Sequence, residues 1–181
     1  MVVSKRRLCK KLIKPFLQMN MVFIGGLLIL FLVVSLFNQH TVSLFSLVGF
    51  SLIGFMPLTI GLGPFIAINL IKGLKYINEQ EKCYEIEFDE DARSIMMEGS
   101  IYEGLDWYID VSGFQLIVFK NGFITKFEKY KKVGNRGGGT AYVTAICVDG
   151  KKRRLRGPVS SIARLRKWVG SCRKQVKTSN N

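Results

Sequence analysis

Hydrophobic residues are distributed very unevenly along this chain. Between Met19 and Ile71 there is no Asp, Glu, Lys or Arg, whereas charged residues are frequent on both sides of this stretch. A short polar segment, NQHTVS at 38–43, divides the run into two parts, at about 16–37 and 42–71. Each part exceeds the ~18 apolar residues that indicate a membrane-spanning helix. The pattern therefore predicts a two-helix transmembrane hairpin.

The second apolar segment contains residues that disturb a straight helix. Pro57 lacks a backbone donor, and GLGP at 61–64 adds a second proline, so we expect this helix to bend or break. The glycines also permit close packing of neighbouring helices. Because the stretch has no ionisable residue that would bind or relay an ion, packing is favoured over a pore or a substrate path.

The positions of the basic residues predict the orientation of the hairpin. Six Lys or Arg and no acid precede the first apolar segment in VSKRRLCKKLIK, and Lys72 and Lys75 follow the second segment. Since Lys and Arg are enriched in cytoplasmic loops, we expect an integral protein of the inner or plasma membrane with both termini in the cytoplasm. The chain then divides into a basic N-terminus (1–15), a transmembrane hairpin (16–76) and a cytoplasmic domain (77–181).

Alternating polarity predicts strands in the segment DWYIDVSGFQLIVFKNGFITKF at 106–127. Both SG and NG fit two-residue hairpin loops, which gives three antiparallel strands. In this register Trp107 faces Val118 on an apolar core face. The opposite face is half polar, but it carries an apolar patch that we expect to face a partner or to be covered by the protein's own loops; the patch consists of Tyr108, Ile117, Phe119 and Ile124.

Further strands and one helix are expected around this sheet. YEIEF at 84–88 and SIMMEG at 94–99 alternate in polarity and predict a hairpin, and TAYVTAICV at 140–148 leads through DG into KKRRLRG and predicts another. From Pro158 to about Lys177, apolar residues recur at spacings of three and four. Proline is favoured in the first turn of a helix, so an amphipathic helix is expected at the C-terminus.

These elements describe an α+β protein in which about seven short antiparallel strands are followed by one helix. The order of a two-helix hairpin, then WYIDVSGFQLIVFKNGFI, then a DGKK hairpin and RGPVSSIARLRKWV resembles bacterial membrane proteins that carry a cytoplasmic pleckstrin-homology-like (PH-like) domain. The resemblance is one of layout and covers most of the chain. It implies an antiparallel β-barrel or sheet with a C-terminal helix, and a scaffold or interaction module with no particular ligand.

Few residues are suited to catalysis or to metal binding. The four cysteines lack a C-x-x-C spacing, and the only histidine, His40, lies between the apolar segments, so neither a zinc site nor a Cys/His pair is expected. GNRGGGT at 134–140 lacks the lysine and the helix of a P-loop. Asp106 and Asp110 share one strand face but are expected to be surface acids. We therefore expect no cofactor, no metal and no enzymatic activity.

Charge divides the cytoplasmic domain into two parts. Residues 77–110 contain eleven acids and two bases, whereas residues 111–181 contain seventeen Lys or Arg and two acids. Near an anionic leaflet each cation contributes about 1 kcal/mol. We expect one basic surface, and its candidate binding residues are Lys151, Lys152, Arg153, Arg154, Arg156, Arg164, Arg166 and Lys167.

Three kinds of partner fit a basic surface beside a membrane. Anionic lipid headgroups fit the tether best, and an acidic membrane protein partner comes second. Nucleic acid is disfavoured, because the cations are not interleaved with aromatic residues for base stacking. The leading functional prediction is thus a membrane-anchored binding or scaffold protein. The alternative is an accessory, inhibitory or immunity-type subunit of a larger membrane complex that acts through the hairpin, and a homo-oligomer is compatible with both.

Overall fold

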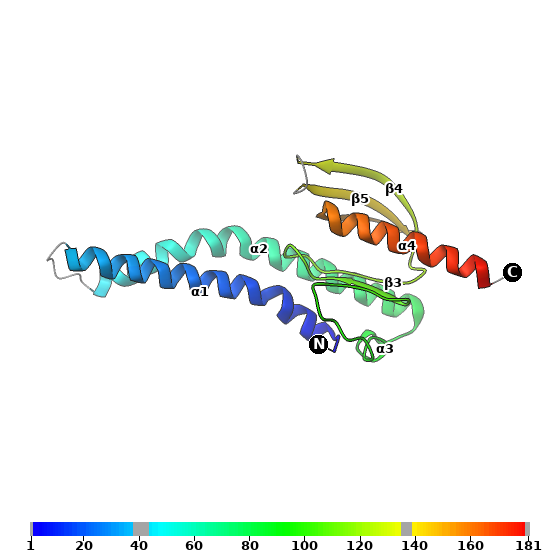
Figure 1. The fold of residues 1–181 in the computed structure, drawn as a ribbon, viewed down its shortest axis with the longest axis horizontal. Helices are drawn as coiled ribbons and strands as arrows, with labels where there is room; N and C mark the ends of the chain where they lie inside the picture. The colour runs from blue at the N-terminus through cyan, green and yellow to red at the C-terminus, as the bar shows by residue number, and fades with distance from the viewer. Residues whose placement is uncertain (1, 38–43, 135–138, 180–181) are drawn as a thin grey trace.

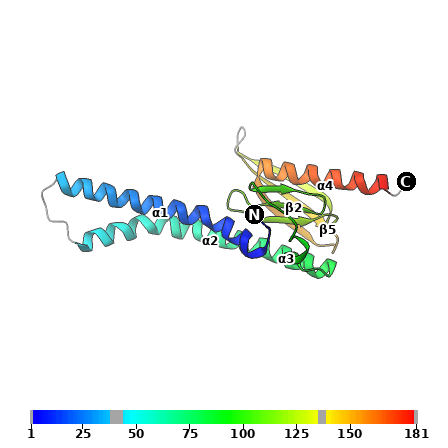
Figure 2. The same cartoon turned by 60° about the horizontal axis from the view of Figure 1, so that its bottom comes forward.

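The computed structural model of the chain describes residues 2–37, 44–134 and 139–179. The polar segment with His40 and the centre of the glycine-rich stretch, 135–138, lie outside these residues. Within the described part, four helices and six strands follow the order α1, α2, α3, β1 to β6 and α4. Two long helices form a hairpin that extends away from the strands (Figure 1). Figure 2 shows the same arrangement from a second direction, with the start of the chain beside the strands.

The hairpin consists of α1 (Lys5–Phe37) and α2 (Leu44–Tyr84), which run antiparallel side by side. Both helices are long and apolar enough to cross a membrane. The predicted break in the second helix is not present, because α2 continues through Pro57 and Pro64 and only curves along its length (Figure 1). Breaking a helix in an apolar environment would leave backbone groups unpaired, which favours the continuous form.

Both helices extend past the uncharged run and into the domain. The first turns of α1 contribute Leu8 and Leu12 to a buried cluster, in which they meet Ile66 and Ile77 of α2 and Trp107 of the sheet. Burial of apolar surface stabilises this contact by roughly 25 cal/mol per Å². The segment expected to be a separate basic N-terminus is therefore packed against the domain.

The first sheet is antiparallel and consists of β1 (Ile101–Glu103), β2 (Trp107–Asp110) and β3 (Ile117–Lys120). The predicted two-residue loop at SG is wrong, because Asp110 pairs with Ile117 and residues 111–116 form a longer connection. In this connection Gly113 and Phe114 both have positive φ, 57° and 59°. The register differs from the predicted one by two residues, so each side chain keeps its predicted face.

The predicted NG turn is present, but it does not form the predicted hairpin. Phe123 N donates to Lys120 O (3.1 Å), and Gly122 has a φ of 81°. The strand that follows joins a second antiparallel sheet, which consists of β4 (Ile124–Val133), β5 (Thr140–Cys147) and β6 (Lys152–Pro158). The strands thus form two separate three-stranded sheets, and the barrel implied by the PH-like resemblance is not closed.

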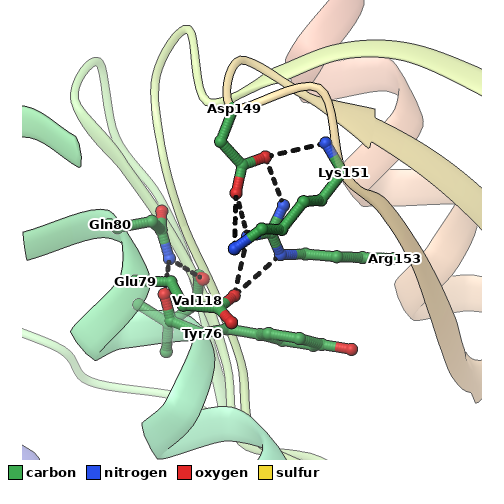
Figure 3. Close-up of polar contacts among 7 residues, drawn as sticks. All are labelled: Tyr76, Glu79, Gln80, Val118, Asp149, Lys151 and Arg153. Atoms are coloured by element: carbon green, nitrogen blue, oxygen red, sulfur yellow. Dashed lines mark hydrogen bonds and ion pairs between the residues drawn. The ribbon is translucent and has the colours of Figure 1, made fainter. Parts of the chain in front are cut away.

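A side chain of α2 occupies the edge of β3 where the third strand of the meander was expected. The side chain of Gln80 donates from Nε2 to Val118 O (2.9 Å; Figure 3), and Lys120 N donates to Gln80 Oε1 (2.6 Å). Gln80 is fully buried. Its amide pairs with two backbone groups at the edge of β3, as a neighbouring strand would. This explains why β4 does not pair with β3.

The predicted hairpin at 84–88 and 94–99 is wrong. The helix α2 continues to Tyr84, a short helix α3 occupies Phe88–Asp91, and residues 94–99 contribute one isolated bridge. Phe88 is fully buried in the cluster beneath the first sheet. Alternation over five residues does not determine a strand when the same apolar side chains pack elsewhere.

The predicted C-terminal helix is confirmed as α4 (Val159–Ser179). Its side chains enter a buried cluster that also contains the inner faces of both sheets. The buried apolar residues that the structure describes on α4 are Ile162, Leu165, Trp168, Val169 and Cys172. The cluster that contains Leu8 and Leu12 lies on the opposite face of the first sheet, between this sheet and the hairpin. The first sheet is therefore buried on both faces.

Candidate functional site

The basic residues predicted on β6 lie in two different environments. Lys152, Arg154 and Arg156 are exposed on the outer face of the second sheet, while Arg153 points inward and is 4% exposed. This alternation follows the two-residue period of a strand. One of the predicted surface cations is therefore a buried structural residue.

Arg153 is held by carboxylates from two elements (Figure 3). Its guanidinium donates to Glu79 Oε2 of α2, at 2.9 Å from Nε and 2.7 Å from Nη2, and to both carboxylate oxygens of Asp149 in the β5–β6 turn, at 2.8 and 2.6 Å. The hydrogen bonds to Asp149 raise the pKa of Arg153, and the same bonds lower the pKa of Asp149 to about 2. This cluster joins α2 to the second sheet.

The outer face of the second sheet gathers exposed cations from β4 and β6 around a tyrosine of β5. Tyr142 pairs in register with Lys131 on one side and Arg156 on the other. The guanidinium groups of Arg154 and Arg156 lie 5.4 and 5.6 Å from the centroid of the Tyr142 ring. We refer to this surface as the basic face; it consists of Lys126, Lys129, Lys131, Lys152, Arg154 and Arg156.

The cations of α4 do not join the basic face. The helix covers the inner side of the second sheet (Figure 1), so the exposed cations that were predicted on it lie on the other side of that sheet; they are Arg164, Arg166 and Lys167. Arg166 lies over the ring of Tyr130, 5.0 Å from its centroid. Lys151 is exposed in the β5–β6 turn, 4.0 Å from Asp149. The single basic surface expected from the sequence is thus divided.

The predicted partner-facing patch is covered by the chain itself. Its four residues are between 0% and 6% exposed and belong to the cluster formed with the second sheet and α4; they are Tyr108, Ile117, Phe119 and Ile124. The Tyr108 hydroxyl donates to Ser161 O (3.0 Å), and burial raises the pKa of Tyr108. These residues form core, so the expectation of a partner at this position is corrected.

A groove lies where the basic face meets α2. It has a volume of about 240 Å³, with one wall formed by α2 and the other by Arg154 and Arg156 of β6. Lys72 of α2 adds a third cation, and none of the described residues that line the groove is acidic. Arg156 lies over the ring of Phe65, 5.3 Å from its centroid. We refer to this feature as the α2–β6 groove.

Three residues of this region were not predicted as functional. Lys72 and Phe65 were assigned only to the end of a membrane helix, and Tyr142 only to a strand. A two-residue loop at DG would have paired Tyr142 with Gly157; the loop is one residue longer in the structure, and Tyr142 pairs with Arg156. The contact of that pair with Phe65 depends on how α2 packs against the sheets, which no local pattern encodes.

The described residues contain no group of three or more His, Cys, Asp or Glu arranged for a metal ion. Cys147 is buried, and burial raises the pKa of its thiol. Of the two acids expected at the surface, Asp106 is exposed, but Asp110 is 1% exposed, and its Oδ1 has no hydrogen-bond partner. The expectation for Asp110 is therefore wrong, because the second sheet and α4 cover its strand.

A comparison of the chain with protein-family models, with curated proteins and with solved structures found no match. The resemblance to membrane proteins with a PH-like domain stays at the level of layout, which is two long apolar helices followed by two small antiparallel sheets. The geometry of the described residues is therefore the basis for assigning a function.

Proposed function

We propose that this protein is a membrane-anchored binding module. In this proposal α1 and α2 span the bilayer as a hairpin with both termini in the cytoplasm, and the basic face of the domain contacts the anionic leaflet beside the hairpin. The proposed role is binding, because the groups gathered on the basic face are cations around a tyrosine ring, and such groups attract anions.

The length of hairpin that the domain leaves uncovered supports the anchor. The helices approach closely at Gly63, where a Cβ would lie 4.0 Å from the Phe16 ring, and the domain packs on the helices beyond this point. The uncovered segments, 17–37 and 44–61, are about 31 and 27 Å long at 1.5 Å per residue. The hydrocarbon core of a bilayer is about 30 Å thick. The two lengths match without any part of the domain entering the membrane.

Cations on α1 support the same boundary. Because the helices are antiparallel and Phe16 meets Gly63, Lys14 lies at about the level of Phe65, on the side of the domain. Lys10 and Lys14 are exposed. Long basic side chains at the end of an apolar segment extend into the headgroup region, and such residues are enriched on the cytoplasmic side. The domain and both termini are therefore assigned to the cytoplasm.

The position of Arg156 is the observation that carries the proposal. Its guanidinium lies 5.3 Å from the ring of Phe65, which closely follows the uncovered segment of α2. The basic face thus begins where α2 leaves the hydrocarbon, within the short range over which a charged leaflet attracts cations. Because the hairpin holds the domain there, the contact is effectively intramolecular.

Lysine labelling of the full-length protein in nanodiscs tests this function. An amine-reactive reagent is applied in neutral phosphatidylcholine discs and in discs that also contain phosphatidylglycerol, and labelling is measured by mass spectrometry. We expect Lys129 and Lys131 to react more slowly in the anionic discs, and about 1 M salt, with a Debye length of ~3 Å, to remove the difference. Lys82, exposed near the end of α2, is the internal reference. Equal rates in both discs would contradict the proposal.

A further inference from the structure

We propose that the α2–β6 groove holds the headgroup phosphate of a single anionic phospholipid. The inference rests on the proposed function, because it requires α2 to leave a bilayer near Phe65. It also goes beyond that function. Contact of the basic face with a leaflet is diffuse and involves many lipids, whereas the groove selects one molecule and retains it.

Two arginines of the groove are positioned to bind an anion. Arg154 and Arg156 are two residues apart on β6, so they share one face, and both guanidinium groups lie on the Tyr142 ring. Among the described residues neither has an ion pair, whereas Arg153, which precedes them on the same strand, is neutralised by two carboxylates. The outward arginines are thus positioned by an aromatic ring, and their charge remains uncompensated.

The opposite wall adds charge of the same sign. Lys72 of α2 lines the groove, and no acidic residue does so in the part of the chain that the structure describes. Arginine matches the geometry of phosphate oxygens with two parallel hydrogen bonds, and lysine adds a point charge. Three cations around one concave space therefore favour a phosphate over a neutral or cationic ligand.

The wall formed by α2 changes along the helix from apolar to basic. Phe65, Ile68 and Lys72 are spaced by three and four residues, so they lie on one face of α2, and all three line the groove. Ile68 is 51% exposed. An anionic lipid has the same order, with acyl chains in the bilayer and a phosphate above them. The volume of about 240 Å³ is below the ~300–1,000 Å³ of typical small-molecule pockets, so it suits a headgroup while the chains stay in the membrane.

The floor of the groove contains a polar group without a partner. Gln115 lines the groove and is 7% exposed, and its Oε1, which lies next to Gly157, has no hydrogen-bond partner among the described residues. Buried acceptors are nearly always satisfied, so a donor from outside the chain is expected at this position. The hydroxyls of a glycerol headgroup supply such a donor, which makes phosphatidylglycerol the appropriate probe.

Native mass spectrometry of the full-length protein in mild detergent tests the inference. Without a leaflet, a lipid remains only if a defined site holds it. We expect one phosphatidylglycerol adduct, and no matching adduct with phosphatidylcholine, whose choline the cations repel. The variant with Arg154→Gln and Arg156→Gln should lose binding by about tenfold or more, because charge-assisted hydrogen bonds are removed.

A second double variant provides the matched control. Arg164→Gln and Lys167→Gln remove the same charge from exposed positions of α4, outside both the groove lining and the basic face, and binding should change by less than about twofold. Near-ultraviolet circular dichroism of Trp107 and Trp168 verifies that both variants are folded. Equal binding of the two lipids, or an equal loss in both variants, would overturn the groove site.

The labelling experiment in nanodiscs separates the inference from the function on which it rests. If Lys129 and Lys131 are protected in anionic discs but no lipid adduct survives in detergent, the groove site is wrong and leaflet contact stands. If protection is also missing, both are wrong.

Discussion

Arg153 of β6 and Glu79 of α2 form a buried ion pair, with 2.7 Å between Nη2 and Oε2 (Figure 3). The pair connects the second sheet to the long helix of the hairpin. Because Arg154 and Arg156 follow Arg153 on the same strand, the pair also determines where the basic face lies relative to the end of the apolar helix. A residue predicted to be a lipid contact is thus a structural residue that positions the proposed lipid contacts.

Replacing Arg153 with Ala should destabilise the domain strongly. The substitution leaves Glu79 and Asp149 close together without a cation, and breaking a buried pair in this way costs about 3–5 kcal/mol. Since both carboxylate side chains are 23% exposed and regain some water, we expect about 2–4 kcal/mol, measured by urea unfolding followed by tryptophan circular dichroism. Lys152→Ala is the control: its side chain is 63% exposed, so its loss should cost less than about 1 kcal/mol. Equal costs would contradict this role of Arg153.

The Gln80 amide is expected to protect the edge of β3. Gln80→Leu keeps an apolar side chain of similar size but leaves Val118 O and Lys120 N unpaired, at about 1–3 kcal/mol for each buried group. The Lys120 amide should also exchange its hydrogen faster in the variant, as measured by hydrogen exchange. Asn78→Ala, at an exposed position of the same helix, should leave that exchange rate unchanged. An unaltered Lys120 rate in Gln80→Leu would show that the amide is not needed.

The free energy of unfolding is expected to depend on the ionisation of the Asp149 carboxylate at low pH. Its pKa falls from the usual 3.8 to about 2 in the folded protein, so its contribution to stability is complete above about pH 4 and is lost as the pH falls through 2. The stability difference between the wild type and Asp149→Asn should therefore shrink over this window, as followed by urea unfolding at each pH. A difference that stays constant from pH 6 to 2 would argue against the ionised pair.

Two glycines should respond oppositely to the same substitution. A Cβ on Gly73 would lie 2.7 Å from the Leu116 side chain and 2.8 Å from its backbone oxygen, so Gly73→Ala should separate α2 from the 111–116 connection and destabilise the domain by about 1–3 kcal/mol. Gly170 of α4 has nothing within 4 Å of such a Cβ, and Gly170→Ala should stabilise by about 0.5–1 kcal/mol. Thermal unfolding of both variants gives the comparison; a neutral Gly73→Ala would refute the close contact.

Thiol labelling is expected to report the orientation in the membrane. Cys83 is exposed near the end of α2, whereas Cys147 and Cys172 are buried. A membrane-impermeant maleimide should label Cys83 in inverted vesicles but not in intact cells, and the two buried thiols should react only after denaturation. Labelling of Cys83 in intact cells would place the domain outside and reverse the proposed topology.

Several elements were predictable from local pattern. The long apolar run indicated two helices because length and lack of charge are the signal itself, and α4 followed from Pro158 and the spacing of Ile162 and Leu165. The faces of β2 and β3 were also correct, since side chains alternate whatever the loop length. The sequence predicted the candidate cations as one set, but it did not predict that they are divided between two surfaces.

The remaining errors share one cause, which is contact between segments far apart in the chain. The connection at SG is longer than predicted, and there the side chain of Asn69 of α2 donates to Phe114 O (3.2 Å). The strand β4 does not pair with the first sheet, because Gln80 occupies the edge of β3. Both contacts come from α2: Asn69 lies in the segment that the pattern assigned to the membrane hairpin (16–76), and Gln80 lies in the segment that it assigned to the cytoplasmic domain (77–181).

The sequence by itself thus determined the hairpin, the terminal helix and the concentration of positive charge in the last third, because each depends on neighbouring residues and on their affinity for water. Only the tertiary structure decided which cations are exposed. Arg153 is buried and Arg154 is not, since a strand alternates its side chains but does not specify which of its faces meets the core. That choice depends on the packing of α2 and α4, where burial of apolar surface and pairing of buried charge are satisfied together.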